Sequence, residues 1–259
     1  MIDIGANLTH KSFHNEIDRI VREAQEVHVT HQIITGADIQ SSKEAIKIAR
    51  KYPKVLFSTA GIHPHDTKDC NETTLIDLQN LLKEKEVVAV GECGLDYDRC
   101  YSEVSVQKTW FEEQLAIADE LDMPVFLHSR DAFEDFVSIL NNFPKLHKNS
   151  IVHCFTGSKK EVEKYLDMGM SIGVTGWICD SRRNKDLLEA IHSIPLDKLL
   201  IETDAPYLLP RDLKLKHNQN EPKYLPHILN TIARIINVSP EELELKTIEN
   251  TKKFFRLEI

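Results

Sequence analysis

The sequence has no long apolar run and no excess of positive charge. No segment approaches the roughly 20 apolar residues that a membrane-spanning helix needs, and residues 1–16 carry no run long enough for a signal peptide. The formal net charge is −9, which argues against coating of nucleic acid or anionic membrane, because such binding depends on neutralising phosphates with Lys and Arg. A bound metal ion and a few basic side chains can still hold a phosphate at one site. We expect a cytoplasmic protein without membrane partners.

The sequence also lacks C-x-x-C pairs, low-complexity tracts and Gly/Ser linkers. An odd number of cysteines without a secretion signal argues for reduced thiols. The five are Cys70, Cys93, Cys100, Cys154 and Cys179. A hydrophobic content of 41% with 28% charged residues is typical of a globular protein with an ample core. Since nothing divides the chain, we expect one domain over residues 1–259.

Short apolar runs alternate with helical patterns along the chain. The eight expected strands are residues 2–5, 32–36, 55–61, 87–91, 124–127, 150–153, 170–175 and 199–203. Residues 222–259 are predicted to form a helical tail that belongs to the same domain, with Ser239 as an N-cap before Pro240. Eight strands alternating with helices favour an α/β fold, the TIM (β/α)8 barrel. The alternative, an open doubly wound sheet, usually has fewer strands and a Gly-rich phosphate loop that is missing here.

Polar residues directly follow several expected strands. They occur as GIHPH at 61–65, GECGLD at 91–96, HSR at 128–130, HCF at 153–155 and ETD at 202–204. In a TIM barrel the carboxyl ends of the strands converge on one mouth, where the chemistry takes place. We therefore expect these side chains to lie close together.

Each of these residues alone has an ordinary structural explanation, but together they form a donor set for a divalent metal. Glu92, His128, His153 and Asp204 are the predicted ligands. A metal so held activates water and polarises a phosphoryl or carbonyl oxygen, so hydrolysis is the expected reaction. Glu92 and Asp204 are the predicted catalytic carboxylates. Asp204 either ligates the metal or deprotonates the attacking water, while Glu202 points into the barrel wall or toward the ligands.

Two further residues are candidates for binding a substrate phosphate. His63 follows the third expected strand beside Pro64, and Arg130 offers a planar fork of donors. The alternative for Arg130 is a simple ion pair with Asp131 or Asp135 on the following helix. The role of Asp96 also stays open, because this residue could belong to the site or could only cap a loop.

Taken together, these ordered motifs resemble those of the TatD family of metal-dependent deoxyribonucleases. The resemblance rests on GIHP, GECGLD, HSR, HCFTG and ETDAPY, followed by NEP at 220–222, and it spans almost the whole chain. It implies a TIM-barrel hydrolase that cleaves DNA, and also RNA, as a 3′–5′ exonuclease on single strands or 3′ ends. By position, Glu92, His128 and His153 match metal ligands, Asp204 the active-site aspartate and His63 a phosphate-facing residue. Mg is the expected cation, with Mn and Zn as alternatives.

One departure from the family pattern concerns the first strand. Many members carry His-x-His there, whereas this chain has Gly5 and Asn7. Glycine offers no ligand and asparagine only a weak oxygen. We therefore expect one main metal site, and a weaker second position bordered by Asn7, Asp204 and Glu202.

Two other functions compete with a nuclease. The same metal chemistry hydrolyses esters and amides, including the ester of a D-aminoacyl-tRNA. A barrel without catalysis is the second alternative, and we consider it unlikely because a scaffold has little reason to gather these ligands at one rim. Three aromatic residues could stack on bases or merely pack the rim, namely Tyr97, Trp177 and Tyr207.

Overall fold

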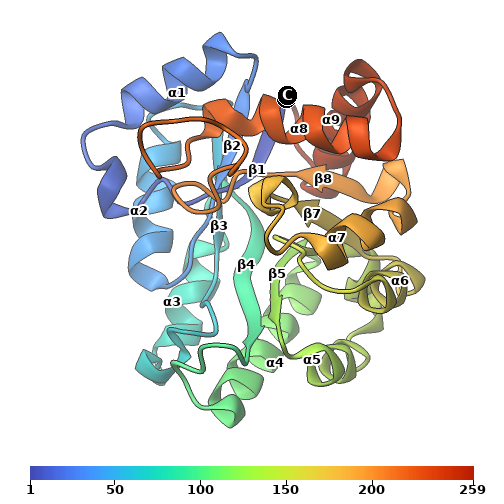
Figure 1. Ribbon diagram of the computed structural model, residues 1–259. Helices are drawn as coiled ribbons and strands as arrows, with labels where there is room; N and C mark the ends of the chain where they lie inside the picture. The colour runs from blue at the N-terminus through green and yellow to red at the C-terminus, as the bar shows by residue number, and fades with distance from the viewer.

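The computed structural model describes residues 1–259 and contains one eight-stranded parallel sheet in the order β1 to β8 (Figure 1). The strands are β1 (Ile2–Ala6), β2 (His31–Ile34), β3 (Leu56–Ala60), β4 (Val87–Asp96), β5 (Val125–Arg130), β6 (Ser150–Val152), β7 (Ser171–Val174) and β8 (Leu199–Ile201). All eight lie where the apolar runs predict them. Sequential order with parallel pairing is the topology of the expected barrel.

The barrel closes where β8 meets β1. The Asp204 amide donates to the Gly5 carbonyl at 2.8 Å, and the Asn7 amide donates to the Ala205 carbonyl at 2.7 Å. Just below, the buried Asp3 carboxylate accepts hydrogen bonds from the amide and hydroxyl of Thr203. This seam fixes the backbone on both sides of Asp204.

Two strands extend by several residues beyond the ends that their apolar runs predict, whereas β1 gains only Ala6. β4 continues from Gly91 to Asp96, and β5 continues beyond Leu127 to Arg130. Their extensions pair with each other, so that Gly94 lies opposite His128 and Asp96 opposite Arg130, after a register shift between Val90 and Cys93. The expected ends at residues 91 and 127 were wrong because main-chain pairing needs no apolar side chains.

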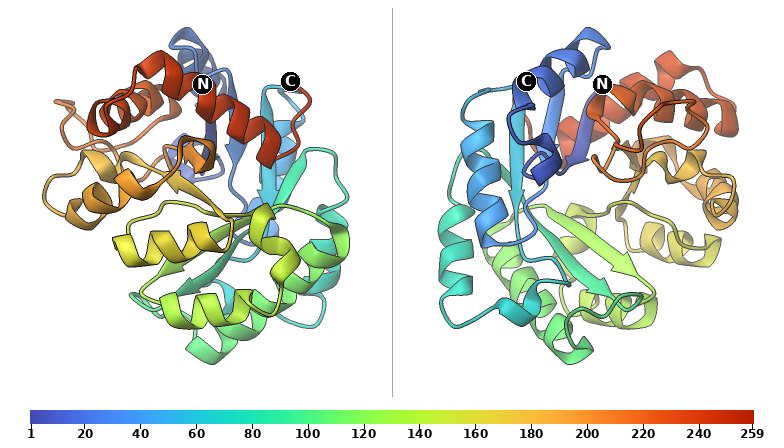
Figure 2. Two further views of the ribbon diagram at one scale, coloured as in Figure 1. Left: turned by 90° about the vertical axis from the view of Figure 1, so that its right-hand side faces the viewer. Right: turned by 60° about the vertical axis from the view of Figure 1, so that its left-hand side comes forward.

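Nine α-helices surround the sheet, as Figure 2 shows from two sides. They are α1 (Ile17–Glu26), α2 (Ile39–Ala49), α3 (Thr74–Leu81), α4 (Val104–Leu121), α5 (Phe133–Leu140), α6 (Lys159–Asp167), α7 (Lys185–Ala190), α8 (Leu225–Ile236) and α9 (Pro240–Phe254). Two short 3₁₀ helices also matter below: η4 (Gly176–Cys179) follows β7, and η7 (Pro222–Tyr224) precedes α8. None of these helices combines the length and the hydropathy of a membrane-spanning segment.

The C-terminal segment is helical, as predicted, and packs on the barrel. The Ser239 hydroxyl accepts from the Glu242 amide at 3.1 Å and caps α9, while the Met1 ammonium donates to Glu244 on this helix at 3.2 Å. Phe255, just beyond α9, joins Ile4, Ile33, Phe126 and other apolar side chains in a buried cluster at the barrel core. We infer from this shared core that residues 1–259 form one domain.

Candidate metal centre

Glu92 lies at the centre of the barrel mouth, where three imidazoles converge on one of its carboxylate oxygens. Glu92 Oε1 is 2.8 Å from Nδ1 of His128, 2.7 Å from Nε2 of His153 and 3.4 Å from Nε2 of His63. The carboxylate comes from the extended part of β4, His128 from the extension of β5, and the other two histidines from just beyond β6 and β3. Glu92 is only 6% exposed, so this oxygen is shielded from bulk solvent.

The electrostatics of this cluster favour positive charge next to Glu92. Burial alone raises the pKa of Glu92, but the facing histidines, led by His153, outweigh it and hold that pKa well below its usual range. Burial acts in the opposite sense on His153, yet Glu92 and Glu202 raise its pKa well above 6.5. The pKa of His128 is likewise raised against its burial, by hydrogen bonds to Asp96 and Glu92.

A second carboxylate, Asp96, lies at the carboxyl end of β4 and contacts the same cluster. Its Oδ2 is 3.1 Å from Nε2 of His128 and 2.9 Å from Nε2 of His65, and its Oδ1 accepts the backbone amides of Asp98 and Arg99. Asp96 is thus both a loop cap and a partner of the central histidine. Sequence reasoning left its role open and gave His65 none, although the repeated His of the GIHPH motif was a usable signal.

Asp204 lies on the opposite side of the mouth. It is held by Asn7, which stands where many members of the resembled family carry the second histidine of His-x-His. Its Oδ1 accepts from the Asn7 side-chain amide at 2.8 Å. Burial raises the pKa of Asp204 to about 7; His153 lowers it, and the charges of Glu92 and Glu202 add to the rise. The predicted catalytic aspartate is therefore brought to the same mouth as the histidine cluster.

Glu202 is fully buried behind His153. Its Oε2 faces His153 Nδ1 at 3.4 Å, and its Oε1 accepts the Cys154 amide. A Cβ built on Gly5 would lie 2.5 Å from one carboxylate oxygen, and one on Gly173 would lie 2.7 Å from the other. The two glycines therefore make the space that Glu202 fills, and Gly5 does more than omit a ligand. The predicted role of Glu202 at a second metal position stays a prediction.

Arg130 lies beside Trp177 at the ends of β5 and β7. Its guanidinium is 5.5 Å from the indole centroid, and that of Arg183 is 3.8 Å from the same ring. The ion partner of Arg130 is Asp98 at 3.7 Å, whereas Asp135, one of the expected alternatives, bonds to Tyr97 and Lys108 instead. Arg130, Trp177 and Arg183 line a cavity of about 250 Å³ next to the histidine cluster.

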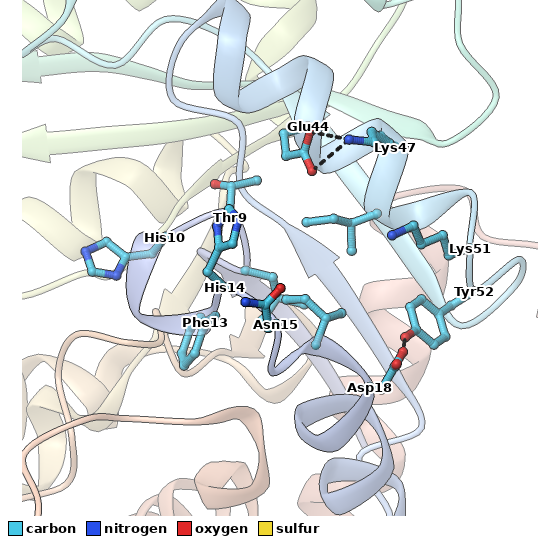
Figure 3. Close-up of a pocket in the computed structure, with 13 residues that line it drawn as sticks. Thr9, His10, Phe13, His14, Asn15, Asp18, Glu44, Lys47, Lys51 and Tyr52 are labelled. Carbon is cyan, nitrogen blue, oxygen red and sulfur yellow. Dashed lines mark hydrogen bonds and ion pairs between the residues drawn. The ribbon is translucent and has the colours of Figure 1, made fainter.

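A larger cavity of about 460 Å³ lies apart from the histidine cluster, beside α1 and α2 (Figure 3). Its wall includes Lys47, which pairs with Glu44 at 3.2 Å, and none of its lining residues belongs to the metal centre. Its lining residue His10 has its ring 5.6 Å from that of Tyr207, near the mouth. Cavity size therefore does not locate the chemistry in this protein.

The side chains present at the mouth fit a divalent metal. His63, Glu92 and His128 offer ligand atoms that all lie within 4.8 Å of one another, and His153 turns a ring nitrogen to the same carboxylate oxygen. Nitrogen and oxygen donors around one shielded point are typical of Zn and Mn centres. His63, predicted to face a phosphate, thus lies among the potential ligands, and its phosphate contact stays a prediction.

Comparison with known proteins agrees with this geometry. The chain is 44% identical to a protein of Erwinia tasmaniensis named 3′-5′ ssDNA/RNA exonuclease TatD, covering 99% of this chain and 100% of that protein. Among solved structures, a TatD homologue from Escherichia coli superposes with a TM-score of 0.92 at 26% identity, covering 99% and 98% of the two chains. A TatD-family hydrolase from Entamoeba histolytica gives 0.88 at 29% identity, covering 98% and 97%. Residues 2–256 match the family described as TatD related DNase, and this chain belongs to that family.

Proposed function

We propose that this protein is a metal-dependent exonuclease that shortens single-stranded DNA, and RNA, from the 3′ end. The observation that carries the proposal is the convergence of three imidazoles on Glu92, across the mouth from Asp204, in a member of the TatD family. The names of the similar curated proteins favour a nuclease over an ester or amide hydrolase such as a D-aminoacyl-tRNA deacylase.

In this proposal the histidine cluster holds the main cation. Glu92, His128 and His153, joined by His63, would hold it, and a cation bound there would supply Lewis-acid chemistry to the scissile phosphodiester and to water. This nitrogen-rich set suits Mn or Zn, whereas Mg, the cation expected from the resemblance, suits the oxygen-rich position bordered by Asn7 and Asp204. Glu202 acts on the main position indirectly, because it faces the far nitrogen of His153 and fixes the orientation of that ring.

Asp204 is the proposed proton acceptor for the attacking water. The Asn7 amide fixes one of its oxygens, which leaves the other free to accept the proton that water loses as its oxygen bonds to phosphorus. The leaving 3′ oxygen of the chain takes a proton from solvent. The negative overall charge fits short contacts to a strand end better than tracking along a duplex.

Exposed aromatic rings at the rim supply the proposed base contacts. Tyr101, at 54% exposure, lies edge-on to His65 with ring centroids 4.7 Å apart, and Tyr207, at 52%, lies beside His10 near Asp204. Exposed aromatics stack on bases of any sequence. Arg130 is the proposed phosphate contact on the neighbouring side. A cytoplasmic location completes the proposal, supported by the five free cysteines.

The test is incubation with single-stranded DNA labelled at the 5′ end, with Mg, Mn or Zn and with EDTA. We expect stepwise shortening that requires metal, that stops when the 3′ end is blocked, and that is lost in the His128→Ala/His153→Ala variant. His192→Ala, which removes an exposed histidine remote from the mouth, is the matched control and should retain activity. Intact DNA with metal bound at Glu92, together with hydrolysis of aminoacyl-tRNA, would refute the proposal in favour of ester hydrolysis.

A further inference from the structure

A second group of potential metal ligands lies outside the histidine cluster. It consists of Cys179 at the end of η4, Asp212 in the segment after β8, and His227 on the first turn of α8. The sulfur, a carboxylate oxygen and a ring nitrogen of these three residues all lie within 4.8 Å of one another. None of the three belongs to the centre around Glu92, so the cluster has no part in the proposed nuclease chemistry.

The geometry of the cluster is partly set before any cation binds. The Nε2–H of His227 donates to Asp212 Oδ1 at 2.7 Å, which holds these two ligand atoms side by side. The Cys179 side chain is buried, whereas His227 and Asp212 are 32% and 42% exposed, so the thiol lies at the inner end and the other two groups face solvent. Cys179 and Asp212 also line a cavity of about 530 Å³, which gives an entering ion a path.

The donor chemistry selects among cations. One thiolate, one imidazole and one carboxylate suit Zn and are unsuitable for Mg, which prefers oxygen ligands only. The thiolate and the carboxylate together supply two negative charges against a divalent cation. Asp180 is already paired with Arg182 and Arg183. Two further basic side chains that line the cavity, Arg211 and Arg234, oppose a cation.

We propose that Cys179, Asp212 and His227 bind one Zn-type divalent cation, which joins the segment after β8 to η4 and α8. On binding, the Cys179 thiol releases its proton to solvent, and the neutral His227 ring exchanges its Nε2–H for an Nδ1–H through solvent. The sulfur and the freed Nε2 lone pair then each form a bond to the cation. Asp212 Oδ1 gives up its hydrogen bond from His227 and forms the third bond to the cation. Three protein ligands leave the fourth tetrahedral position to water from the adjoining cavity.

The segment that carries Asp212 gives this site a structural purpose. Between the end of β8 at Ile201 and the start of η7 at Pro222 there is no helix or strand, only an isolated bridge at Ala205. Irregular connections longer than about 15 residues are uncommon in compact domains, so a segment of this length needs contacts that hold it in place. The same segment carries Asp204 and Tyr207 to the mouth. A cation at Asp212 would restrain it from its outer side.

Cobalt substitution in the full-length protein tests the site independently of nuclease activity. The metal-free protein is titrated with Co²⁺, and the near-ultraviolet absorption of sulfur-to-cobalt charge transfer is followed; the centre at Glu92 has no cysteine among its proposed ligands. We expect the band to saturate when one Co²⁺ occupies this site, beyond the Co²⁺ that the centre at Glu92 takes without a sulfur band. Zn²⁺ should abolish the band and Mg²⁺ should leave it unchanged. Cys179→Ser should remove the band, whereas Cys70→Ser should keep it.

Two further variants keep the test decisive. His227→Gln changes a partly exposed side chain and should weaken Co²⁺ binding at the thiolate site more than about tenfold, because it removes a ligand. Cys154→Ser removes the thiol that follows His153. Absence of any sulfur-to-cobalt band in the parent protein overturns the proposal. So does a band that survives Cys179→Ser and disappears in Cys154→Ser, since the thiolate would then belong to the barrel mouth.

Discussion

The two sides of the barrel mouth are built in different ways. On the side of β3 to β6, Glu92 is held by His128 and His153, and each histidine has a second carboxylate partner, Asp96 for one and Glu202 for the other. On the side of β8 and β1, the only side-chain hydrogen bond of Asp204 is to Asn7. The space beside Gly5 that a larger side chain would occupy is filled by the Glu202 carboxylate.

This contrast explains why one metal position should be strong and the other weak. Side chains fixed by several partners lose little freedom when a cation binds, so the cation keeps more of the gross binding energy. Asp204, with Asn7 as its one side-chain partner, supplies less charge to a cation than the Glu92 cluster and is held by fewer contacts. The missing histidines of β1 and the buried Glu202 are therefore one structural feature, because the same carboxylate orients His153 and excludes a side chain at position 5.

The largest expected difference between the two sides is the loss of activity that a substitution on each side causes. Glu92→Gln removes the charge at the centre of the histidine cluster and should lower kcat/KM by about 10³-fold or more. Asn7→Ala removes one hydrogen bond to Asp204 and should cost only about tenfold. Both are measured with 3′-end shortening of single-stranded DNA at saturating metal. Equal losses for the two variants would show that the asymmetry of the mouth has no functional meaning.

Metal binding to the histidine cluster should strengthen as the pH rises. His128 and His153 have raised pKa values without metal, so they retain protons above pH 6.5 that a cation must displace. The same shift stabilises the metal-free fold below pH 6.5, and that contribution is lost as the pH rises through the raised values. Calorimetric titration with Mn²⁺ should give affinities that change by about tenfold per pH unit for each proton displaced. A pH-independent affinity between pH 6 and 8 would contradict the proposed ligands.

Glu202→Gln tests whether this buried side chain acts through His153. The amide keeps the volume but loses the charge that faces the ring, so we expect metal affinity to fall by about 10- to 100-fold. High metal concentration should restore most of the activity if the role is one of positioning. Glu86→Gln is the control, because it neutralises another buried carboxylate, which pairs with Arg50 directly before β4 and away from the mouth. Normal affinity with lost turnover would instead place Glu202 directly in the reaction.

Gly5→Ala and Gly173→Ala should affect stability more than chemistry. Each Cβ would lie within 2.7 Å of a different oxygen of the same buried carboxylate, so each should lower the free energy of unfolding by about 1–3 kcal/mol. Urea denaturation measures this loss. Because both changes displace one group, their combined effect should fall short of the sum of the single effects. Additive losses would mean that Glu202 does not link the two positions.

Much of this architecture could be predicted from the order of residues alone. The eight apolar runs located every strand. The polar residues that follow them include Glu92, His128, His153 and Asp204, which lie at one mouth of the barrel. The reason is physical. Parallel strands in a closed barrel bring their carboxyl ends to one rim, so a residue that directly follows a strand is predicted to lie at that rim. The cap at Ser239 is local and was equally predictable.

Other features depend on contacts between residues that are remote in sequence. The extensions of β4 and β5 are held by pairing with each other, which no apolar pattern records. Burial of Glu202 between Gly5 and Gly173, and the meeting of Cys179, Asp212 and His227, require a particular side-chain direction and segment placement. The sequence by itself determined which groups reach the mouth of this barrel. Only the tertiary structure decided which of them touch, because partners are chosen by distance and orientation after the chain has closed on itself.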